Sequence, residues 1–265
     1  MSRLNGTILA LGLAFYLPTV MAGDGAIEIN AACVPDGCFA GDDPGFPVEI
    51  ASSGSYVLTS NLAVSDAVTT AIVIDSNNVT LDLNGFTVGG PVECSGTPAT
   101  CSTSGTGIGI DGYPYSRIHV FNGNVVGFGD TGVVVGTAAR LENLRVASNG
   151  IDGIDVGAGA TITGCKVIRN GAVGINAYGL EAMLELNHSL IRGNGGYGAR
   201  VQSGVVTHNR FSHNGDNGLR SYTSSSAAAY AQNIFRGNGD GSAGDQLQGG
   251  LTTGCNVVAD SAVCP

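Results

Sequence analysis

The sequence contains no tryptophan, one lysine and eight prolines, and only 12% of its 265 residues are charged. So small a charged fraction, combined with 43% hydrophobic residues, argues against the composition of a disordered chain. The net charge of −10 argues against nucleic-acid binding, because that activity needs a basic footprint. Glycine is abundant instead, with 43 residues, and predicts a turn-rich chain that buries one long core.

One dipeptide recurs through the second half of the chain at steps of 21, 24, 20 and 24 residues: Asn149-Gly150, Asn170-Gly171, Asn194-Gly195, Asn214-Gly215 and Asn238-Gly239. A period in this range is typical of solenoids, in which each unit buries its apolar face by stacking on the next. Apolar residues alternate on both sides of the dipeptide, and this period of two predicts short strands.

A sharp bend between two strands suits Asn-Gly, because both residues tolerate the left-handed backbone region. The dipeptide also favours hairpins, but a hairpin would leave the near-constant spacing of five copies unexplained. Coiling explains it, because each turn then lies above the previous one and the five Asn side chains form a ladder. We therefore predict a right-handed parallel β-helix of about seven to nine coils, with ~22 residues in each.

The first residues are typical of a secretory signal peptide. Met1–Ala22 has a cationic start at Arg3, an apolar run from Ile8 to Val20 and a small-residue cleavage site. The apolar run is shorter than a transmembrane helix requires, and no later stretch is long enough to span a bilayer. We expect residues 23–47 to form an N-terminal cap, 48–250 the β-helix and 251–265 a C-terminal cap. The protein is therefore expected to be secreted, into the periplasm, onto the cell surface or outside the cell.

The seven cysteines fit an oxidising compartment. Six form close neighbours in sequence outside the repeats, which predicts three short-loop disulfides, although sequence alone leaves the connectivity open: Cys33 and Cys38, Cys94 and Cys101, Cys255 and Cys264. Cys165 falls on an inward position of a strand, together with Ser189, Asn209 and Asn233 of later coils. We expect it to be a buried, inert thiol.

The repeat can be followed back to residue 71. Ala71–Ile74, Gly107–Ile110, Gly132–Val135 and Gly153–Val156 are interpreted as the same strand in successive coils. An excess of residues between the first two copies marks Gly89–Thr106 as an insertion, a loop projecting from the stack and pinned by its own disulfide. Such a loop is either a binding wall or a variable decoration.

The segment Asn78–Phe86, the Asn spacing and the Gly-opened strands resemble the right-handed parallel β-helix proteins of the pectin-lyase-like superfamily. The resemblance covers roughly residues 48–250, and its motifs specify the fold and not the reaction. It implies an extracellular role on a polysaccharide, since members include lyases, glycoside hydrolases and epimerases, with tailspikes and adhesins beside them.

Diagnostic catalytic motifs of that superfamily are missing from the sequence. The acidic pairs and the Arg-Ile-Lys motif of polygalacturonases do not occur, and no acidic cluster suited to calcium falls on one strand column. Asp42-Asp43 lies in the cap, where a solvated turn is the favoured interpretation. Asn238–Asp245 resembles a single calcium-binding nonapeptide, but a plain turn explains it better. No metal site is predicted, and calcium is the one cofactor left open.

Stacking the coils predicts an outward column on one face: Val73, Gly109, Val134, Asp155, Asn176, Arg200 and Arg220. Two residues further along, Gly157, Tyr178, Gln202 and Tyr222 should form a second column. Arg200 and Arg220 would repel each other unless an anion bridges them, and tyrosines suit sugar rings. These residues predict a site for a uronate-bearing glycan, although a solvated β-face with incidental arginines is an equal alternative.

A further column holds Arg145, Lys166, Leu190 and Arg210. Lys166 is a candidate lyase base that would act together with Arg200 and Arg220. An edge cation that discourages aggregation is the commoner explanation of this lysine. His188 and His208 should also stack one coil apart, as turn residues more than as metal ligands.

The sequence thus predicts a secreted β-helix that binds or processes an acidic polysaccharide. Two alternatives stay open: a polysaccharide lyase that acts by β-elimination, and a non-catalytic structural or adhesive protein. The glycan, the calcium dependence and the oligomeric state are not specified by these residues.

Overall fold

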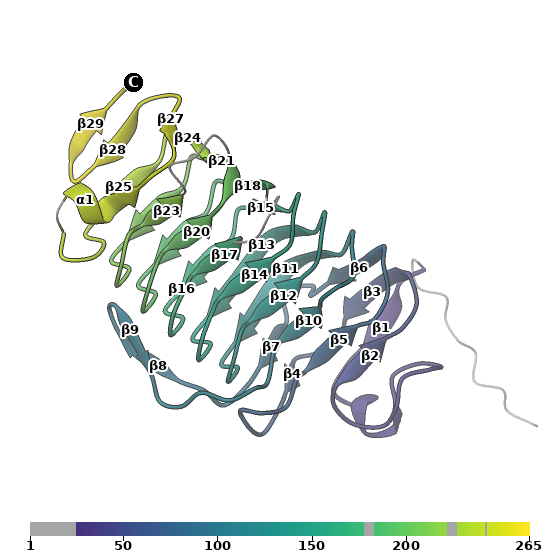
Figure 1. The fold of residues 1–265 in the computed structure, drawn as a ribbon. Helices are drawn as coiled ribbons and strands as arrows, with labels where there is room; N and C mark the ends of the chain where they lie inside the picture. The colour runs from purple at the N-terminus through teal and green to yellow at the C-terminus, as the bar shows by residue number, and fades with distance from the viewer. Residues whose placement is uncertain (1–24, 178–182, 222–226, 242) are drawn as a thin grey trace, which may run out of the picture.

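The computed structural model describes residues 25–177, 183–221, 227–241 and 243–265. These residues form the predicted right-handed parallel β-helix (Figure 1), while the expected signal peptide lies outside the described range. Within this range, sheet B has nine parallel strands, one for each coil, in agreement with the predicted coil number. They are β2 (Val48–Ile50), β5 (Ile72–Ile74), β10 (Ile110–Gly112), β12 (Val133–Val135), β14 (Ile154–Val156), β17 (Ile175–Ala177), β20 (Ala199–Val201), β23 (Leu219–Ser221) and β26 (Leu247–Gln248).

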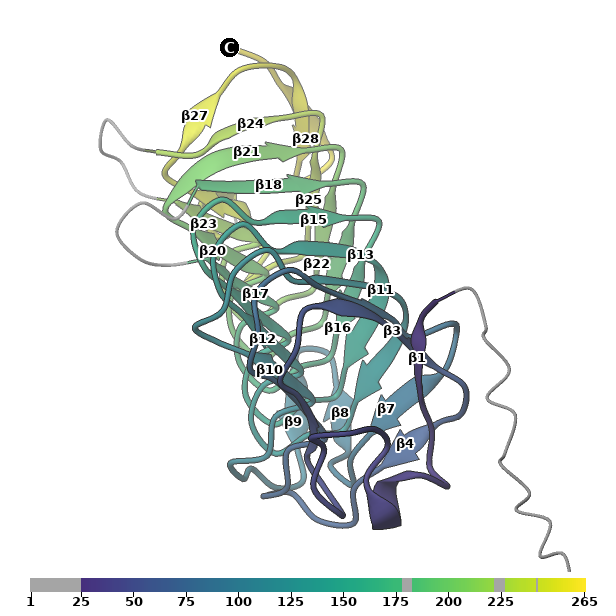
Figure 2. The same cartoon turned by 90° about the vertical axis from the view of Figure 1, so that its right-hand side faces the viewer.

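Sheet A supplies the other two faces of the coil, which we call A1 and A2. Face A1 is stacked in Figure 2 and contains β1 (Ile27–Ile29), β3 (Gly54–Leu58), β6 (Val79–Asp82), β15 (Thr161–Thr163), β18 (Met183–Asn187), β21 (Ser203–Thr207), β24 (Ala229–Ala231) and β27 (Leu251–Thr252). Face A2 contains β4 (Leu62–Ala63), β7 (Thr87–Gly89), β16 (Lys166–Ile168), β19 (Leu190–Arg192), β22 (Arg210–Ser212), β25 (Ile234–Arg236) and β28 (Asn256–Val258). Two long strands, β11 (His119–Val126) and β13 (Arg140–Ala147), pair with both faces and so run across the corner between them.

The core is a set of apolar columns, because equivalent residues of successive strands pair directly. Ile154, for example, pairs with Val133 before it and Ile175 after it, and all three are fully buried. Such stacking shields each apolar residue from water by its counterparts above and below, which gives the chain one continuous core.

The predicted asparagine ladder is confirmed. The side chains of Asn149, Asn170, Asn194, Asn214 and Asn238 are fully buried. Asn194 Oδ1 accepts hydrogen bonds from the backbone N–H and the Nδ2 of Asn170, both at 3.0 Å, and the same pattern joins each neighbouring pair. Gln246 ends the ladder, since its Oε1 accepts both bonds from Asn238.

The prediction that Asn-Gly itself provides the left-handed backbone of the bend is wrong for four of the five copies. The left-handed residue is the one before the asparagine: Ser148, Arg169, Gly193, His213 and Gly237 have φ between 56° and 67°. In four of the five copies the glycine is needed for close stacking instead. A Cβ on Gly195 would lie 2.1 Å from the carbonyl oxygen of Gly171 in the preceding coil.

A second ladder lies at the corner between A1 and A2. Here Ser189, Asn209, Asn233 and Asn256 are buried, and each accepts the backbone N–H of the residue one coil earlier, beginning with Cys165. The sequence marked the first three as inward positions, but did not predict their mutual hydrogen bonds.

The three expected disulfides are present in the described chain, and Cys165 is a buried free thiol. Burial, the largest cause, raises the pKa of this thiol to about 11, which agrees with an inert cysteine. Three disulfides indicate an oxidising setting.

The stack extends beyond the expected range 48–250 at both ends. At the start, β1 pairs with β3, and a short 3-10 helix, η1 (Val34–Asp36), follows it. At the far end, after the short helix α1 (Ala243–Gln246), β27 and β28 pair with β24 and β25. An antiparallel strand, β29 (Ser261–Val263), then folds back on β28. No helix of the described residues has the length and apolarity to cross a membrane.

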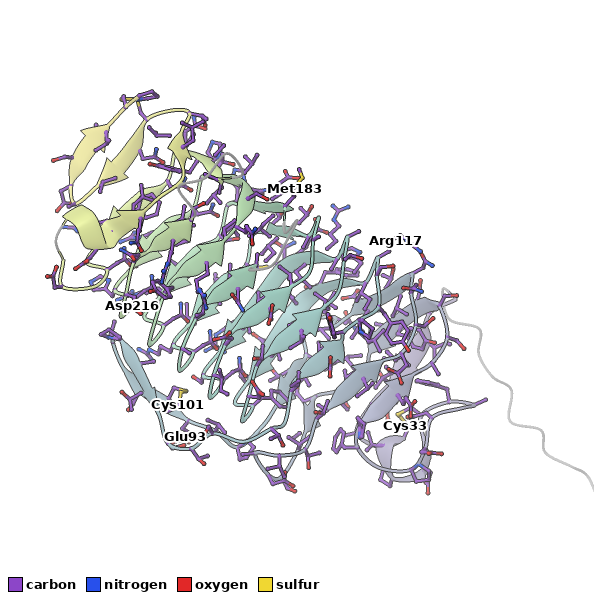
Figure 3. The ribbon with its side chains drawn as sticks, in the orientation of Figure 1. Cys33, Glu93, Cys101, Arg117, Met183 and Asp216 are labelled. Carbon is purple, nitrogen blue, oxygen red and sulfur yellow. A yellow bond between two sulfur atoms is a disulfide. The ribbon has the colours of Figure 1, made fainter. Side chains whose placement is uncertain are left out.

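The insertion Gly89–Thr106 does not project from the stack as expected. Its antiparallel hairpin, β8 (Cys94–Gly96) and β9 (Ala99–Cys101), runs along the row of Asn-Gly turns, as Figures 1 and 3 show. Ala99 N donates to Gly193 O at 2.9 Å, and the Sγ atoms of Cys94 and Cys101 lie 3.6 and 3.5 Å from Asn149 O. The hairpin therefore covers the corner between A2 and sheet B.

Replacing Asn194 by alanine should strongly destabilise the fold, because three buried groups each lose a hydrogen-bond partner. These are the side-chain Nδ2 and the backbone N–H of Asn170, and the carbonyl oxygen of Val167. At roughly 1–3 kcal/mol for each unsatisfied group, we expect a loss of about 3 kcal/mol or more in the free energy of unfolding, measured by chemical denaturation. Asn187→Ala, at a half-exposed position on A1, is the control and should cost less than about 0.5 kcal/mol. Equal losses in both variants would contradict a stabilising role for the ladder.

Two adjacent glycines test the close stacking of the turns. Gly195→Ala should lower the thermal midpoint markedly, since its Cβ would also lie 2.9 Å from Ala99 O of the hairpin. Gly196→Ala brings its Cβ only to 3.3 Å from Ala172 O and should have a small effect. Thermal denaturation followed by circular dichroism compares them, and the prediction fails if the two midpoints agree.

Candidate functional site

The outward side chains of sheet B form one row along the helix axis. The strand pairings align Glu49, Val73, Asp111, Val134, Asp155, Asn176, Arg200, Arg220 and Gln248. Neighbouring strands of a sheet are ~4.8 Å apart, so consecutive members of the row lie within reach of one ligand. The structure thus brings together Asp155, Asn176, Arg200 and Arg220, as the sequence predicted.

Gly109 does not belong to this row, and its place is taken by Asp111. The strand of this coil begins two residues later than expected, because the insertion displaces the repeat just before it. Gly109 lies against the turn of the following coil, where a Cβ would be 2.4 Å from Gly132 O and 2.9 Å from the Phe128 ring. The first half of the row therefore carries the carboxyl groups of Glu49 and Asp111.

Asp155 is the carboxyl group most altered by its surroundings. Burial raises its pKa to about 6, and the nearby charge of Asp152 acts in the same direction, while a hydrogen bond from Asn176 opposes it. Burial likewise raises the pKa of Asp152, which accepts the backbone N–H of Val173 at 2.8 Å. Asp155 can therefore hold or release a proton near neutral pH.

Arg200 and Arg220 occupy paired positions on β20 and β23. Tyr197, three residues before Arg200, holds both: its hydroxyl accepts a hydrogen bond from Arg220 Nη1, and its ring centroid lies 5.0 Å from the Arg220 Cζ and 5.7 Å from the Arg200 Cζ. A cation near an aromatic face is stabilised by the ring quadrupole. Tyr197 thus positions two guanidinium groups side by side at the same end of the row.

Tyr197 was missed in the sequence, although a signal was present. It stands directly before Gly198, in the position that Asp152 occupies before Gly153, and the backbone bonds place these positions one above another. Tyr178 and Tyr222, the tyrosines predicted for this face, lie outside the described residues. Gln202 follows β20, and its backbone N–H donates to Ala177 O at 3.1 Å.

Lys166 lies away from this row. It is exposed on β16 of face A2, where it pairs with Arg145 and Leu190, and Leu190 pairs with Arg210, as the predicted column requires. Since Arg200 and Arg220 are on sheet B, the structure does not bring the three candidate catalytic residues together.

Two minor candidates are also placed. Asp42 is buried and accepts the backbone N–H groups of Cys38 and Glu49, both at 2.8 Å, so it stabilises a turn and is not a solvated residue. Asp245 Oδ2 accepts the backbone N–H of Asp240, a local turn contact. Among the residues that the structure describes, no group of three His, Cys, Asp or Glu side chains is placed to hold a metal ion.

Titration of Asp155 should appear in the stability of the protein. Its pKa is about 6 in the folded chain and near 3.8 when unfolded, so folding favours the protonated form. The resulting stability is present below about pH 4 and is lost as the pH rises through 6. Asp155→Asn should therefore gain about 2 kcal/mol relative to wild type between pH 4 and pH 7.5, measured by urea denaturation. The exposed Asp216→Asn is the control, and a pH-independent difference for Asp155→Asn would contradict the shift.

Most of the chain matches a known protein family. The family model described as "Right handed beta helix region" matches residues 48–204 and, in a second overlapping match, 106–262. Among solved structures, the chain is similar to the Azotobacter vinelandii mannuronan C-5 epimerase AlgE6 A-module, with 18% identity, a TM-score of 0.36, and 80% of this chain and 65% of that chain covered. It is also similar to the Dettilon tailspike protein, with 16% identity, a TM-score of 0.32, and 69% and 42% covered.

The chain thus spans less than two thirds of the length of either solved structure. No curated protein sequence matches it.

Proposed function

The chain belongs to the right-handed β-helix family, and from the row of side chains that this fold presents on sheet B we propose that it is a secreted protein that binds an acidic, uronate-bearing polysaccharide. The observation that carries the proposal is the pair Arg200 and Arg220, aligned on adjacent strands and held by Tyr197. Guanidinium groups bind carboxylates through two parallel hydrogen bonds, so a uronate carboxylate is the anion that fits them.

The remainder of the row suits the rest of a sugar chain. Asn176 and Asp155 follow Arg200 at successive strand spacings and offer amide and carboxyl groups to hydroxyls. An open sheet face admits a long linear ligand, because such a ligand can continue past both ends of the row. A glycan parallel to the helix axis would meet the cationic end with one uronate and the Asp155 end with its neighbours.

Secretion is part of this proposal. Three disulfides fit an oxidising compartment, and Met1–Ala22 has the composition of a signal peptide. A non-catalytic structural or adhesive role is compatible with the same compartment and differs by the absence of glycan binding.

Cleavage of the glycan by β-elimination is the second candidate, favoured by the contact between Arg220 and Tyr197. Elimination needs cations that neutralise the uronate carboxylate, a base that removes the proton at C5, and an acid for the departing oxygen. Arg200 and Arg220 supply the cations, and the Tyr197 hydroxyl, which accepts a hydrogen bond from Arg220 Nη1, is the oxygen placed beside them to act as the base. Asp155 is the carboxyl group suited to the acid. Lys166 takes no part, because it lies on A2.

The test is binding of a uronate trisaccharide by isothermal titration calorimetry, with a neutral trisaccharide as the comparison ligand. Arg200→Ala/Arg220→Ala should weaken the uronate affinity about tenfold or more, since each charged hydrogen bond contributes roughly 1.5–3 kcal/mol. Arg140→Ala, an exposed arginine on A1, is the matched control and should bind as wild type does. An unchanged affinity in the double variant would exclude the sheet B site.

The same samples separate binding from cleavage. A lyase produces unsaturated sugar ends that absorb in the ultraviolet, and Tyr197→Phe should then abolish product formation more than binding. Binding without product supports recognition alone, and neither binding nor product supports the structural role.

A further inference from the structure

Face A2 concentrates positive charge on a chain whose net charge is −10. Six of the eleven Lys and Arg residues lie on it or at its edge: Arg145, Lys166, Arg169, Arg192, Arg210 and Arg236. All six are exposed. The strands β16, β19, β22 and β25, and the A2 half of β13, contain no Asp or Glu. The positive charge of this face is therefore not neutralised within these strands, although Arg236 at its C-terminal end forms an ion pair with Asp260, with Nε and Oδ1 3.2 Å apart.

Four of these cations are arranged with one on each successive coil. Arg145 pairs with Lys166, and Lys166 pairs with Leu190 of the next strand. That strand contributes Arg192, two residues further along on the same outward side, and the next coil contributes Arg210, which pairs with Leu190. Since coils are ~4.8 Å apart, the four charges form a track of about 14 Å parallel to the helix axis.

A shallow hollow of about 630 Å³ lies beside the far half of this track. Arg192 and Arg210 line it together with Leu190, Ile234 and the imidazoles of His188 and His208. The two imidazole rings are stacked 4.8 Å apart with an interplanar angle of 3°. Flat rings and aliphatic side chains next to cations offer an apolar surface to a sugar ring and charge partners to its carboxylate.

We propose that this track, Arg145, Lys166, Arg192 and Arg210, is a second binding site, which takes a linear polyuronate with one sugar residue on each coil. Both the spacing of the coils and the positive charge of these four side chains favour this ligand. A 1,4-linked uronate residue advances by roughly one strand spacing and brings one carboxylate, so a chain that lies along the track passes each coil with about one carboxylate. Duplex nucleic acid places its phosphates about 3.4 Å apart along each strand and does not keep this register.

The track is separate from the sheet B site. The β8–β9 hairpin covers the corner between the two faces, so one short glycan does not reach both. Each site therefore adds its own bound glycan molecule to the number counted per protein chain.

The test is native mass spectrometry of the full chain with a uronate hexasaccharide. Wild type should bind two molecules, Lys166→Glu/Arg210→Glu should bind one, and the residual A2 affinity should fall at least tenfold. The matched control, Lys166→Arg/Arg210→Lys, keeps the charge and should bind two. Lys166→Ala/Arg210→Ala, with smaller electrostatic change, gives the same readout should the reversed charges impair folding.

The outcomes separate the two sites. The track is overturned if Lys166→Glu/Arg210→Glu and Lys166→Ala/Arg210→Ala both still bind two molecules, or if wild type binds only one and Arg200→Ala/Arg220→Ala loses it. If Arg200→Ala/Arg220→Ala still binds two and the Glu and Ala variants of Lys166 and Arg210 bind fewer, the track stands and the sheet B site fails. Single-stranded DNA or dextran sulfate that displaces the hexasaccharide from A2 as well as polyuronate does would show that charge alone suffices, and would overturn the spacing argument.

Discussion

The ladder joins five successive coils through the buried amides of Asn149, Asn170, Asn194, Asn214 and Asn238, and each amide oxygen from Asn170 onward accepts two hydrogen bonds from the coil before it. Because the amide oxygen is buried and its donors are fixed, the chain has one register in which these bonds form. A slip of one residue would turn every inward side chain outward. The ladder also binds the backbone of A2, where Asn194 Nδ2 donates to Val167 O, and it therefore determines which residues meet on sheet B and on A2.

That register brings residues far apart in the sequence into two surfaces of different character. On sheet B, carboxyl groups and guanidinium groups share one row, with Asp111 and Asp155 toward one end and Arg200 and Arg220 toward the other. On A2 the half of β13 that carries Arg145 and the strands that carry Lys166, Arg192 and Arg210 have positive charges alone. A chain with a net charge of −10 can thus present local cationic sites, because the solenoid sorts charges by position within the coil and not by position in the sequence.

The sequence was sufficient for the fold, since the steps between Asn-Gly copies measure the length of a coil directly. It was sufficient for Asp155, Asn176, Arg200 and Arg220 as well, because these lie in regularly spaced coils. It failed at Asp111, where the insertion shifts the strand by two residues and no periodic signal fixes the new start. Tyr197 was missed for a different reason: alternation identifies which strand residues face outward, but not where a turn residue before the strand directs its ring. The hairpin's position along the turns depends on contacts such as Ala99 N to Gly193 O, which leave no trace in the local pattern.

The β8–β9 hairpin affects the order in which the coils unfold. Solenoids generally lose their terminal units one at a time, since each unit contacts only its immediate neighbours. Here residues of a single insertion, Thr103, Cys101, Ala99 and Pro98, lie against the turns of four successive coils, at Gly150, Gly171, Gly195 and Gly215. One insertion, closed by the Cys94–Cys101 disulfide, thus links these four coils to one another. Fraying that starts at the C-terminal end would stop at the coil of Gly215, and the coils that carry Asp155, Arg200 and Arg220 would melt as one cooperative block.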